Sequence, residues 1–324
     1  MKKRVFSGIR PTGKLHIGNY LGAVKNYVAM QNEYECVYSI VDLHALTTLN
    51  NTAKLQENTY EAFLDLLAAG LDPQKSVVFV QSHVPEINEL FTILSMATPL
   101  SWLLRVPTFK EKARLHAQNV NYGLVGYPVL MTADIVLYKA EHVPVGEDQL
   151  PHLELAREIV RRFNEIFGDT FPEPQAKLTN YPLVVGLDGK DKMSKSLDNH
   201  IEIAATDEET TKRVMSAMTD PSRKLRSDPG HPEVCNVSKL RKHFEPSLAT
   251  QFESECREAK IGCVSCKQAL ANAINNDLAP FRKRRKELSA NPEYVHKAME
   301  NGAYRAQIIA RETIDEVKRK VGLK

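Results

Sequence analysis

The sequence has no long apolar run and little net charge. None of its windows approaches the stretch of about eighteen apolar residues that a membrane-spanning helix needs, so we expect no membrane-spanning segment and no membrane partner. The net charge of +3 is too small to indicate a nucleic-acid partner by itself. The start, MKKRVFSGIRPTG, has neither a long apolar stretch nor a small-residue cleavage site, and so is not typical of a signal peptide. The expected location is cytoplasmic.

Cysteine is scarce and unevenly distributed. Cys36 stands alone at the start of an apolar segment and is expected to be a core residue. The others follow the pattern C-x20-C-x6-C-x2-C and are Cys235, Cys256, Cys263 and Cys266. In a reducing compartment this grouping indicates a metal site rather than disulfides. Sulfur-only ligation is compatible with zinc, which general frequency slightly favours, or with an iron–sulfur cluster. The alternative is unligated thiols used as small core residues.

The first half of the chain alternates between strand-like and helix-like patterns. The short apolar segments expected to be strands are Arg4–Ile9, Cys36–Val41, Ser76–Ser82, Glu141–Gly146 and Tyr181–Gly186. Helical periodicity occupies Gly18–Gln31 and also Thr52–Ala69, which ends at Gly70 as a plausible C-cap. Nearly continuous apolar strands that alternate with helices predict an α/β fold with a doubly wound parallel sheet.

The second half has a different pattern. Strand-like segments end, and charged helical patterns run from Asp207 to Lys324. We therefore expect a boundary near Ser196, with a sheet domain of residues 1–196 and an α-helical domain of residues 197–324. The chain has no internal repeat and no low-complexity segment.

The first expected strand leads into GIRPTGKLHIGNYLGA, residues 8–23. A strand, a Gly-rich turn and a helix N-terminus form a phosphate-binding arrangement, because free backbone N–H groups and the helix dipole favour an anion. Gly18 lets a ligand approach the backbone, and His16 and Asn19 have donors for phosphate oxygens. The alternative is an ordinary turn in which the polar side chains cap the helix.

A second segment, VVGLDGKDKMSKSLDN (residues 184–199), carries Lys190, Lys192 and Lys195 between glycines and aspartates. These lysines are too polar to bury. A positive loop after an apolar strand suits an anion that is held briefly and then released.

Together, HIGN (His16–Asn19) and KMSKS (Lys192–Ser196) resemble the two signature sequences of class I aminoacyl-tRNA synthetases. The first has Asn19 in place of the family's second histidine, and the second matches without change. The segments FSGIRPTGKLHIGNYLGA, YSIVDLHALT and residues 127–164 are similar to those of bacterial tryptophanyl-tRNA synthetases. The resemblance implies a Rossmann-like core and a tryptophan–tRNA ligase activity. ATP would activate L-tryptophan to tryptophanyl-adenylate with loss of pyrophosphate, and the tryptophanyl group would pass to tRNA(Trp).

The resemblance also implies roles for individual residues. The catalytic residues would be His16, Asn19, Lys112, Lys192 and Lys195. ATP, accompanied by Mg²⁺, would contact Arg10, Thr12, Gly18, Asn19, Gly146, Asp148, Lys192, Met193, Ser194 and Lys195. Tryptophan would contact Phe6, Gly8, His44, Tyr127, Met131, Asp134, Val145 and Gln149, with Asp134 accepting the indole N–H.

Some of these residues can also be interpreted without the resemblance. A lone carboxylate in LMTADIVLY must be hydrogen-bonded or cost several kcal/mol, and an indole N–H would satisfy it. The alternative for Asp134 is an outward-facing helix N-cap. The alternative for Asp148 and Gln149 is N-capping of the next helix, and for His44 it is a buried structural role. Arg10 stands where many relatives have glutamine, which leaves its role open.

A subset of bacterial tryptophanyl-tRNA synthetases has a similar cysteine pattern and binds a [4Fe–4S] cluster near the anticodon site. The resemblance therefore favours iron–sulfur over zinc, with a structural or tRNA-contacting role. It also implies a homodimer with an interface around Leu94–Leu104, including Trp102. The basic segment Phe281–Glu287 is expected either to contact tRNA phosphates or to be a solvated helix face.

Three other interpretations remain open. A tyrosyl-tRNA synthetase has a similar fold and dimer, but a phenol needs a different partner from the one that an indole N–H needs. A metabolic nucleotidyltransferase shares the first turn but does not need a long helical domain after KMSKS. A catalytically inactive paralogue could bind RNA or sense iron, although His16, Asn19, Asp148 and the loop lysines are all present.

Overall fold

The structure is a computed structural model and describes residues 2–49, 51–106, 109–110, 114, 120–178, 184–195 and 197–324. Its residues group into two compact units. The sheet unit comprises residues 1–13, 26–179 and 290–324, and the helical unit comprises residues 14–25 and 180–289. The chain thus crosses between units several times, whereas the sequence predicts one boundary near Ser196.

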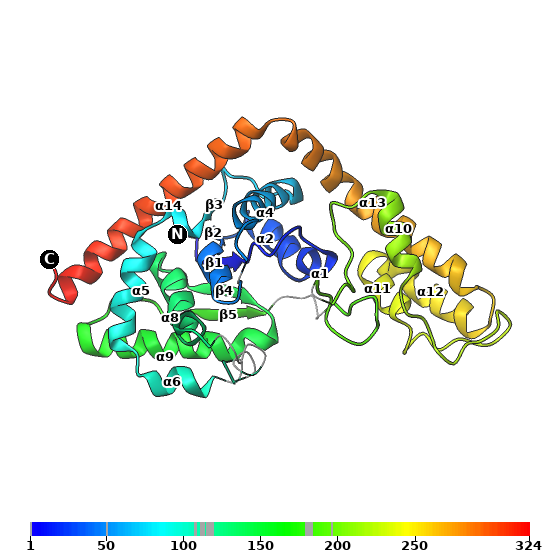
Figure 1. Cartoon of the computed structure of the whole chain (residues 1–324), viewed down its shortest axis with the longest axis horizontal. Helices are drawn as coiled ribbons and strands as arrows, with labels where there is room; N and C mark the ends of the chain where they lie inside the picture. The colour runs from blue at the N-terminus through cyan, green and yellow to red at the C-terminus, as the bar shows by residue number, and fades with distance from the viewer. Residues whose placement is uncertain are drawn as a thin grey trace. The chain divides into compact units, whose positions relative to one another are not determined.

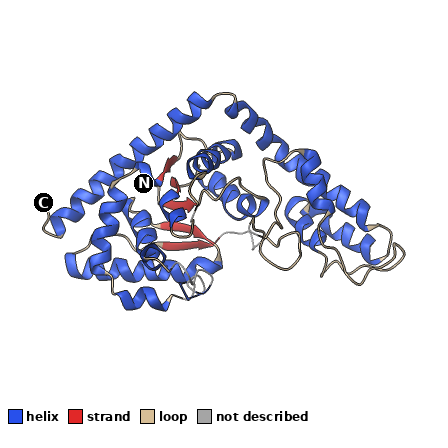
Figure 2. Cartoon of the chain, viewed as in Figure 1, coloured by secondary structure: helices blue, strands red, loops and turns tan. Residues whose placement is uncertain are grey.

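The sheet unit is built on a five-stranded parallel sheet with the strand order β3-β2-β1-β4-β5 (Figure 2). The strands are β1 (Arg4–Ile9), β2 (Glu35–Ile40), β3 (Val77–Val80), β4 (His142–Val145) and β5 (Gln175–Leu178). All of β3 and nearly all of β2 is buried. Because successive strand residues point to opposite faces, both faces are covered. The predicted α/β fold with a parallel sheet is confirmed.

The strand predicted at Tyr181–Gly186 is not formed in its described part. Residues 181–183 lie outside the described residues, and Val184–Gly186 contains only an isolated bridge, between Val185 and Lys192. The sheet instead ends with β5, whose residues Gln175–Leu178 are largely exposed. An edge strand that is open to solvent needs no continuous apolar segment, so its sequence carries little signal.

Helices surround the sheet. They are α2 (Lys25–Met30, which starts at the last residue of the helical unit), α3 (Asp42–Leu46), α4 (Leu55–Ala69), η2 (Gln81–His83), α5 (Glu86–Ala97), α6 (Leu100–Arg105), α8 (Tyr122–Leu137), η3 (Glu147–Gln149), α9 (Leu150–Phe167) and α14 (Pro292–Lys320). The predicted C-cap of α4 is confirmed, because Gly70 has a left-handed backbone with φ of 111°. Cys36 is also in the core, with 1% of its surface exposed.

The C-terminal helix α14 packs against β3, although it follows the helical unit in sequence (Figure 1). A Cβ atom at Gly302 would lie 1.7 Å from the Val78 carbonyl oxygen, so only glycine allows this approach. Lys318 pairs with Glu89 of α5 at 2.6 Å. These contacts are the physical reason that residues 290–324 belong with the sheet.

The helical unit contains α1 (Ile17–Asn19), η1 (Tyr20–Val24), α10 (Asp207–Met215), α11 (Asn236–Phe244), α12 (Pro246–Arg257) and α13 (Cys263–Ser289). The predicted change from strands to helices is therefore confirmed from Asp207 onward. Within the described part of the chain, no helix has both the length and the apolar character needed to span a membrane.

Candidate active site

Asp134 lies inside α8, and only 2% of its surface is exposed. Its carboxylate accepts hydrogen bonds from Gln81 Nε2 at 2.8 and 2.9 Å and has His44 Nε2 at 2.9 Å. The alternative of an outward-facing helix cap is therefore wrong for Asp134. His44 of α3 belongs to the same group, so it has a structural contact whatever else it binds.

Gln81 is the member of this group that the sequence analysis missed. It is fully buried at the start of η2, directly after β3. Its Oε1 accepts the backbone N–H of Leu43 at 3.1 Å, which leaves its amide nitrogen to donate to Asp134. A carboxylate has about four lone-pair positions, and Gln81 and His44 use three of them. Asp134 is thus held as an acceptor with room for one further donor.

Apolar side chains lie around this group. The Phe6 and Tyr138 rings are stacked, with centroids 5.6 Å apart and an interplanar angle of 9°. Tyr138 follows Asp134 by one helical turn, and burial, reinforced by the Asp134 charge, raises the pKa of its hydroxyl far above the ordinary value. Met131 and Val145 are partly buried against the same core. These residues share one hydrophobic cluster, and their role as walls of a substrate pocket stays a prediction.

Gly8, at the carboxyl end of β1, is exposed but closely approached from one side. A Cβ atom there would lie 2.7 Å from Val41 Cγ1, so a side chain would require Val41 to move. Tyr127 is buried in α8, and its hydroxyl lies 2.5 Å from His152 Nε2. His152 is a second polar partner that the sequence analysis did not identify.

Arg10 follows β1 and binds the end of α3. Its guanidinium donates to Thr48 Oγ1 at 2.7 Å and to the Ala45 carbonyl oxygen at 3.4 Å. A cation near a helix C-terminus is favourable, because the last carbonyl groups lack partners. Burial lowers the pKa of Arg10 from its ordinary value. Arg10 therefore fastens the helix that carries His44, while Thr12 stays exposed in the following turn.

Gly146, Asp148 and Gln149 follow β4 at the carboxyl edge of the sheet, where ligands of doubly wound folds bind. Asp148 and Gln149 are exposed, and Gln149 Nε2 donates to Asp148 Oδ2 at 2.7 Å. Gln149 occupies the N-cap position of α9 but makes no side-chain capping bond. The capping alternative is therefore wrong for Gln149. In the described chain, neither side chain hydrogen-bonds to Asp134.

In the helical unit, the HIGN turn begins α1. Asn19 Oδ1 accepts the backbone N–H of His16 at 3.2 Å, so Asn19 does cap the turn, as the alternative interpretation expected. Burial, followed by the charges of Lys195, His200 and Lys192, lowers the pKa of His16 to about 4. The imidazole is therefore neutral at pH 7, because burial and the neighbouring lysine charges both disfavour its protonated form.

The KMSKS segment forms a hairpin in the same unit. Met193 N donates to the Val184 carbonyl at 2.9 Å, and Lys192 is paired with Val185 in an isolated bridge. Met193 is buried, and its Cβ lies 3.4 Å from where a Cβ atom on Gly18 would be. Lys192 is exposed and Lys195 half-buried. The structure thus brings the two predicted signature segments together.

Asn199 organises the base of this hairpin and was not singled out from the sequence. It is 3% exposed; its Oδ1 accepts Ser194 N at 2.7 Å, and its Nδ2 donates to Asp188 Oδ2 at 2.6 Å. Its backbone carbonyl accepts Leu187 N at 2.7 Å.

Of the predicted residues, Lys112 and the last serine of KMSKS, Ser196, lie outside the described residues.

The grouped cysteines come from three neighbouring helices. Cys235 is the N-cap of α11, Cys256 lies in α12, and Cys263 and Cys266 lie in the first turn of α13. Burial raises the pKa of the Cys256 thiol, Cys235 and Cys263 raise it further, and Arg223 lowers it. The thiols are therefore near enough to interact electrostatically. Within the described residues, however, no three His, Cys, Asp or Glu side chains stand in metal-binding geometry.

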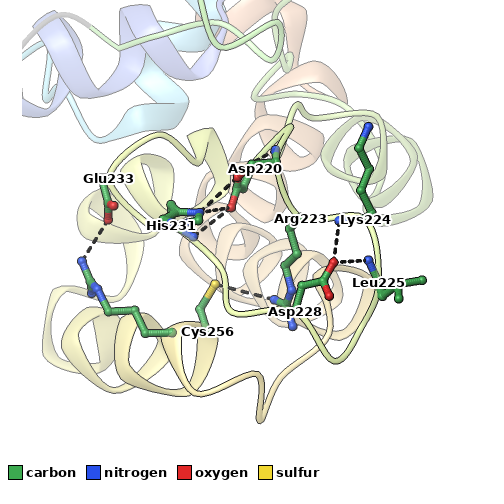
Figure 3. A network of polar contacts seen from close by, with 10 residues as sticks. Asp220, Arg223, Lys224, Leu225, Asp228, His231, Glu233 and Cys256 are labelled. Carbon is green, nitrogen blue, oxygen red and sulfur yellow. Dashed lines mark hydrogen bonds and ion pairs between the residues drawn. The ribbon is translucent and has the colours of Figure 1, made fainter.

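Two arginines approach these sulfurs, Arg241, which is buried, and Arg223, which is half-buried. Arg223 Nη1 donates to Cys256 Sγ at 3.7 Å (Figure 3), and Arg241 Nη2 donates to Cys266 Sγ at 3.8 Å. A Cβ atom at Gly230 would lie 2.4 Å from Cys256 Sγ, so glycine keeps space for the sulfur. N–H donors and cations stabilise thiolate ligands, and so this donor set fits an anionic sulfur-ligated centre.

The basic segment of α13 is only partly solvated. Arg282 is half-buried and donates to Thr210 Oγ1 at 2.7 Å, to Asn275 Oδ1 at 2.9 Å and to Asp207. Its role is therefore to hold α10 against α13. Lys283, Arg284 and Lys286 are exposed and remain candidates for phosphate contacts.

Comparisons with known proteins agree with this arrangement. The family model described as tRNA synthetases class I (W and Y) matches residues 1–279. The chain is 45% identical to the tryptophan–tRNA ligase of Thermotoga maritima, over 99% of this chain and 99% of that protein. It is 46% identical to the tryptophan–tRNA ligase of Deinococcus radiodurans, over 98% of this chain and 98% of that protein. The crystal structure of tryptophanyl-tRNA synthetase from Campylobacter jejuni, complexed with ADP and tryptophan, is 36% identical with a TM-score of 0.89, over 99% of this chain and 100% of that one. The chain belongs to the class I tRNA synthetases of the tryptophan and tyrosine family.

Proposed function

We propose that the chain is a tryptophan–tRNA ligase. The tryptophan carboxylate attacks the α-phosphate of ATP, tryptophanyl-adenylate forms and pyrophosphate leaves. The tryptophanyl group then passes to the 3′ end of tRNA(Trp), and AMP is released. Mg²⁺ accompanies ATP and neutralises part of its charge. Support comes from the family and from tryptophan–tRNA ligases that match nearly the whole chain.

One observation carries the choice of amino acid. Asp134 is buried among apolar side chains, and both of its side-chain partners, Gln81 and His44, act as donors. The remaining acceptor position suits an indole N–H, and Phe6, Met131 and Val145 supply apolar walls. A substrate without that donor would leave a buried carboxylate unsatisfied and would be rejected strongly.

The adenylate step requires positive charge that is positioned in advance. Lys192 and Lys195 hold the ATP phosphates, and Gly18, which is half-buried at the start of the helix, lets a phosphate approach the backbone because it has no side chain. His16 is neutral at pH 7 because its pKa is lowered to about 4, so it donates a hydrogen bond without adding charge. In the sheet unit, Asp148 binds the ATP ribose, and Tyr127 and Gln149 bind the substrate α-amino group.

The test is amino-acid-dependent ATP–pyrophosphate exchange with tryptophan and with tyrosine. We expect exchange with tryptophan only, and a loss of about a thousandfold in kcat/KM for Asp134→Ala. Asp169→Ala, at an exposed position of the same unit, is the control and should retain exchange. Exchange with tyrosine alone would move the assignment to a tyrosyl-tRNA synthetase. No exchange with either, together with salt-dependent RNA binding, would support the inactive paralogue.

We also propose that Cys235, Cys256, Cys263 and Cys266 hold a [4Fe–4S] cluster. The sulfur donor set and the N–H donors of Arg223 and Arg241 fit an anionic centre. When bound, the cluster would anchor the ends of α11, α12 and α13. Iron and acid-labile sulfide in protein purified without oxygen would support it. Zinc alone would favour the alternative metal, and neither would favour unligated thiols.

The assembly and tRNA contacts that we propose use exposed surfaces of the two units. Met96, Leu100 and Leu104 of α5 and α6 are 83%, 60% and 42% exposed, and we propose that they lie in a homodimer interface. Light scattering should give twice the chain mass, and Leu100→Lys should reduce it.

In the proposed division of function, residues 1–196 carry catalysis and residues 197–324 bind the anticodon region of tRNA. Lys283 and Lys286 of α13 contact phosphates in this proposal. Replacing both with alanine should reduce the slope of log affinity against log salt by about two phosphate contacts. An unchanged slope would assign these lysines to a solvated helix face.

A further inference from the structure

The KMSKS hairpin is joined to the cysteine region through one buried side chain, Asn236. This residue is 1% exposed, and its Nδ2 donates to the Gly186 carbonyl oxygen at 2.6 Å. Gly186 begins the tight part of the hairpin, where its N–H donates to the Asp191 carbonyl at 2.8 Å and its carbonyl also accepts Gly189 N at 3.0 Å. A Cβ atom on Gly189 would be 3.6 Å from Asn236 Cβ, so the turn also packs on this residue.

The two ends of the hairpin depend on two different asparagines. Asn199 binds Ser194 and Asp188 and so closes the hairpin on itself. Asn236 is the side chain that ties Gly186 to α11, in a different part of the sequence. Losing Asn199 would disrupt the hairpin internally. Losing Asn236 would leave the hairpin folded and still bonded through Met218 N to the Leu187 carbonyl at 2.8 Å, but without its tie to α11.

Asn236 is the first residue of α11, and its predecessor Cys235 is the N-cap. The other end of α11 also meets the cysteine region, because Arg241 donates to the Cys266 carbonyl at 2.7 Å. The position of α11 is thus set at both ends by segments that carry the grouped thiols. One peptide bond joins Cys235 to Asn236, the residue that holds Gly186. A change in the position of the Cys235 sulfur can therefore change the position of Asn236.

We propose that Asn236 is a positioning residue for the KMSKS lysines and transmits the state of the cysteine centre to them. This inference rests on the proposed function, because it assumes that Lys192 and Lys195 hold ATP phosphates. Ligation of Cys235 fixes the start of α11, Asn236 then holds Gly186, and the hairpin presents its lysines in one arrangement. Tryptophan binding in the sheet unit has no part in this link.

The test compares Asn236→Leu, a near-isosteric change that removes the donor, with the wild type and with Asn272→Leu. Asn272 is exposed on α13, and its side chain accepts a hydrogen bond from Gln268 Nε2 at 3.2 Å, so it is a matched control. We expect kcat for tryptophan-dependent exchange to fall about tenfold in Asn236→Leu, with an unchanged KM for tryptophan. Tryptic cleavage after Lys190, Lys192 and Lys195 should become about tenfold faster, while cleavage after Lys139 in the sheet unit stays constant.

The link to the cysteine centre is tested by Cys235→Ser, which is close in size but replaces the sulfur with a hydroxyl. The same acceleration of cleavage at the hairpin lysines is expected, and it should not add to that of Asn236→Leu in the double variant. Three results would overturn the link through Asn236: additive effects in the double variant, acceleration in Cys235→Ser but not in Asn236→Leu, or no acceleration in Cys235→Ser. Unchanged cleavage and kcat in Asn236→Leu would overturn the positioning role.

Two provisions keep the test decisive. If Asn236→Leu does not fold, Asn236→Ala removes the same donor without adding bulk and is measured in the same way. Proteolysis needs no substrate, so the link can be judged even if the wild type fails to catalyse exchange. In that case the proposed function falls while accelerated cleavage still supports the link.

Discussion

The sheet unit and the helical unit arrange polar groups in opposite ways. Asp134 is buried and already bound by Gln81 and His44, so a ligand must complete a fixed pattern. Lys192 is exposed and Lys195 half-buried on a hairpin, where water screens them. An unsatisfied buried group penalises a wrong ligand, whereas a screened cation binds any phosphate and releases it. The comparison assigns amino-acid selection to the sheet unit and nucleotide turnover to the helical unit.

Among the variants that compare the two units, removing a cation from the hairpin should give the largest effect, and it should change kcat without changing the KM for tryptophan. We expect Lys195→Met to lower kcat for tryptophan-dependent exchange about 10²–10³-fold, because the lysine stabilises charge that develops on the phosphates. The KM for tryptophan should stay within about twofold. Lys190→Met is the control on the same loop and should change kcat by less than about threefold. A parallel rise in the KM for tryptophan would break the proposed division.

Loosening the buried group in the sheet unit should change selection instead. Gln81→Met keeps the side-chain length but removes the donors to Asp134. We expect the KM for tryptophan to rise about tenfold to 150-fold, since a hydrogen bond to a charged group contributes about 1.5–3 kcal/mol. The preference for tryptophan over tyrosine should narrow, and the KM for ATP should stay constant. Gln74→Met, at an exposed position, is the control. An unchanged KM for tryptophan would contradict the role of Gln81.

Local physical rules explain what the sequence could predict. β1 and the end of α4 at Gly70 follow from apolar segments and a left-handed cap, which depend on neighbouring residues alone. Asp134 was recognisable because desolvation is a local property of an apolar segment. The two signature segments were recognisable by resemblance, and the structure brings them together in the helical unit.

Non-local packing explains what the sequence could not predict. Gln81 binds Asp134 across 53 positions, and its one signal was a glutamine directly after the buried strand β3. The exposed edge strand β5 has no apolar pattern to mark it. The return of α14 to the sheet depends on the close approach of Gly302 to Val78, which no helical periodicity reveals. No sequence pattern predicts that Asn199 and Asn236 support the hairpin.

The smallest expected effect concerns the buried neutral His16 of the helical unit. Its pKa is lowered to about 4 in the folded chain, against an ordinary value of 6.5. Above pH 6.5 the imidazole is neutral in both states, so its burial costs nothing extra. Between pH 6.5 and 4 the unfolded chain binds a proton that the folded chain does not, and stability falls as the pH falls. We expect His16→Asn to reduce the loss of unfolding free energy between pH 7 and pH 5 by about 2 kcal/mol.

Urea unfolding of both proteins at pH 7 and pH 5 measures this difference. Because the two proteins differ only at His16, the contributions of all other titrating groups cancel in the comparison. One such group is Asp220: burial raises its pKa, but hydrogen bonds from Ser222 and His231 outweigh burial and lower the pKa below its ordinary range. Equal pH dependence in both proteins would mean that His16 accepts a proton in the folded state, adding a charge next to Lys195. The contrast between the units would then weaken, because the helical unit would bind phosphate through three cations rather than through two cations and a neutral donor.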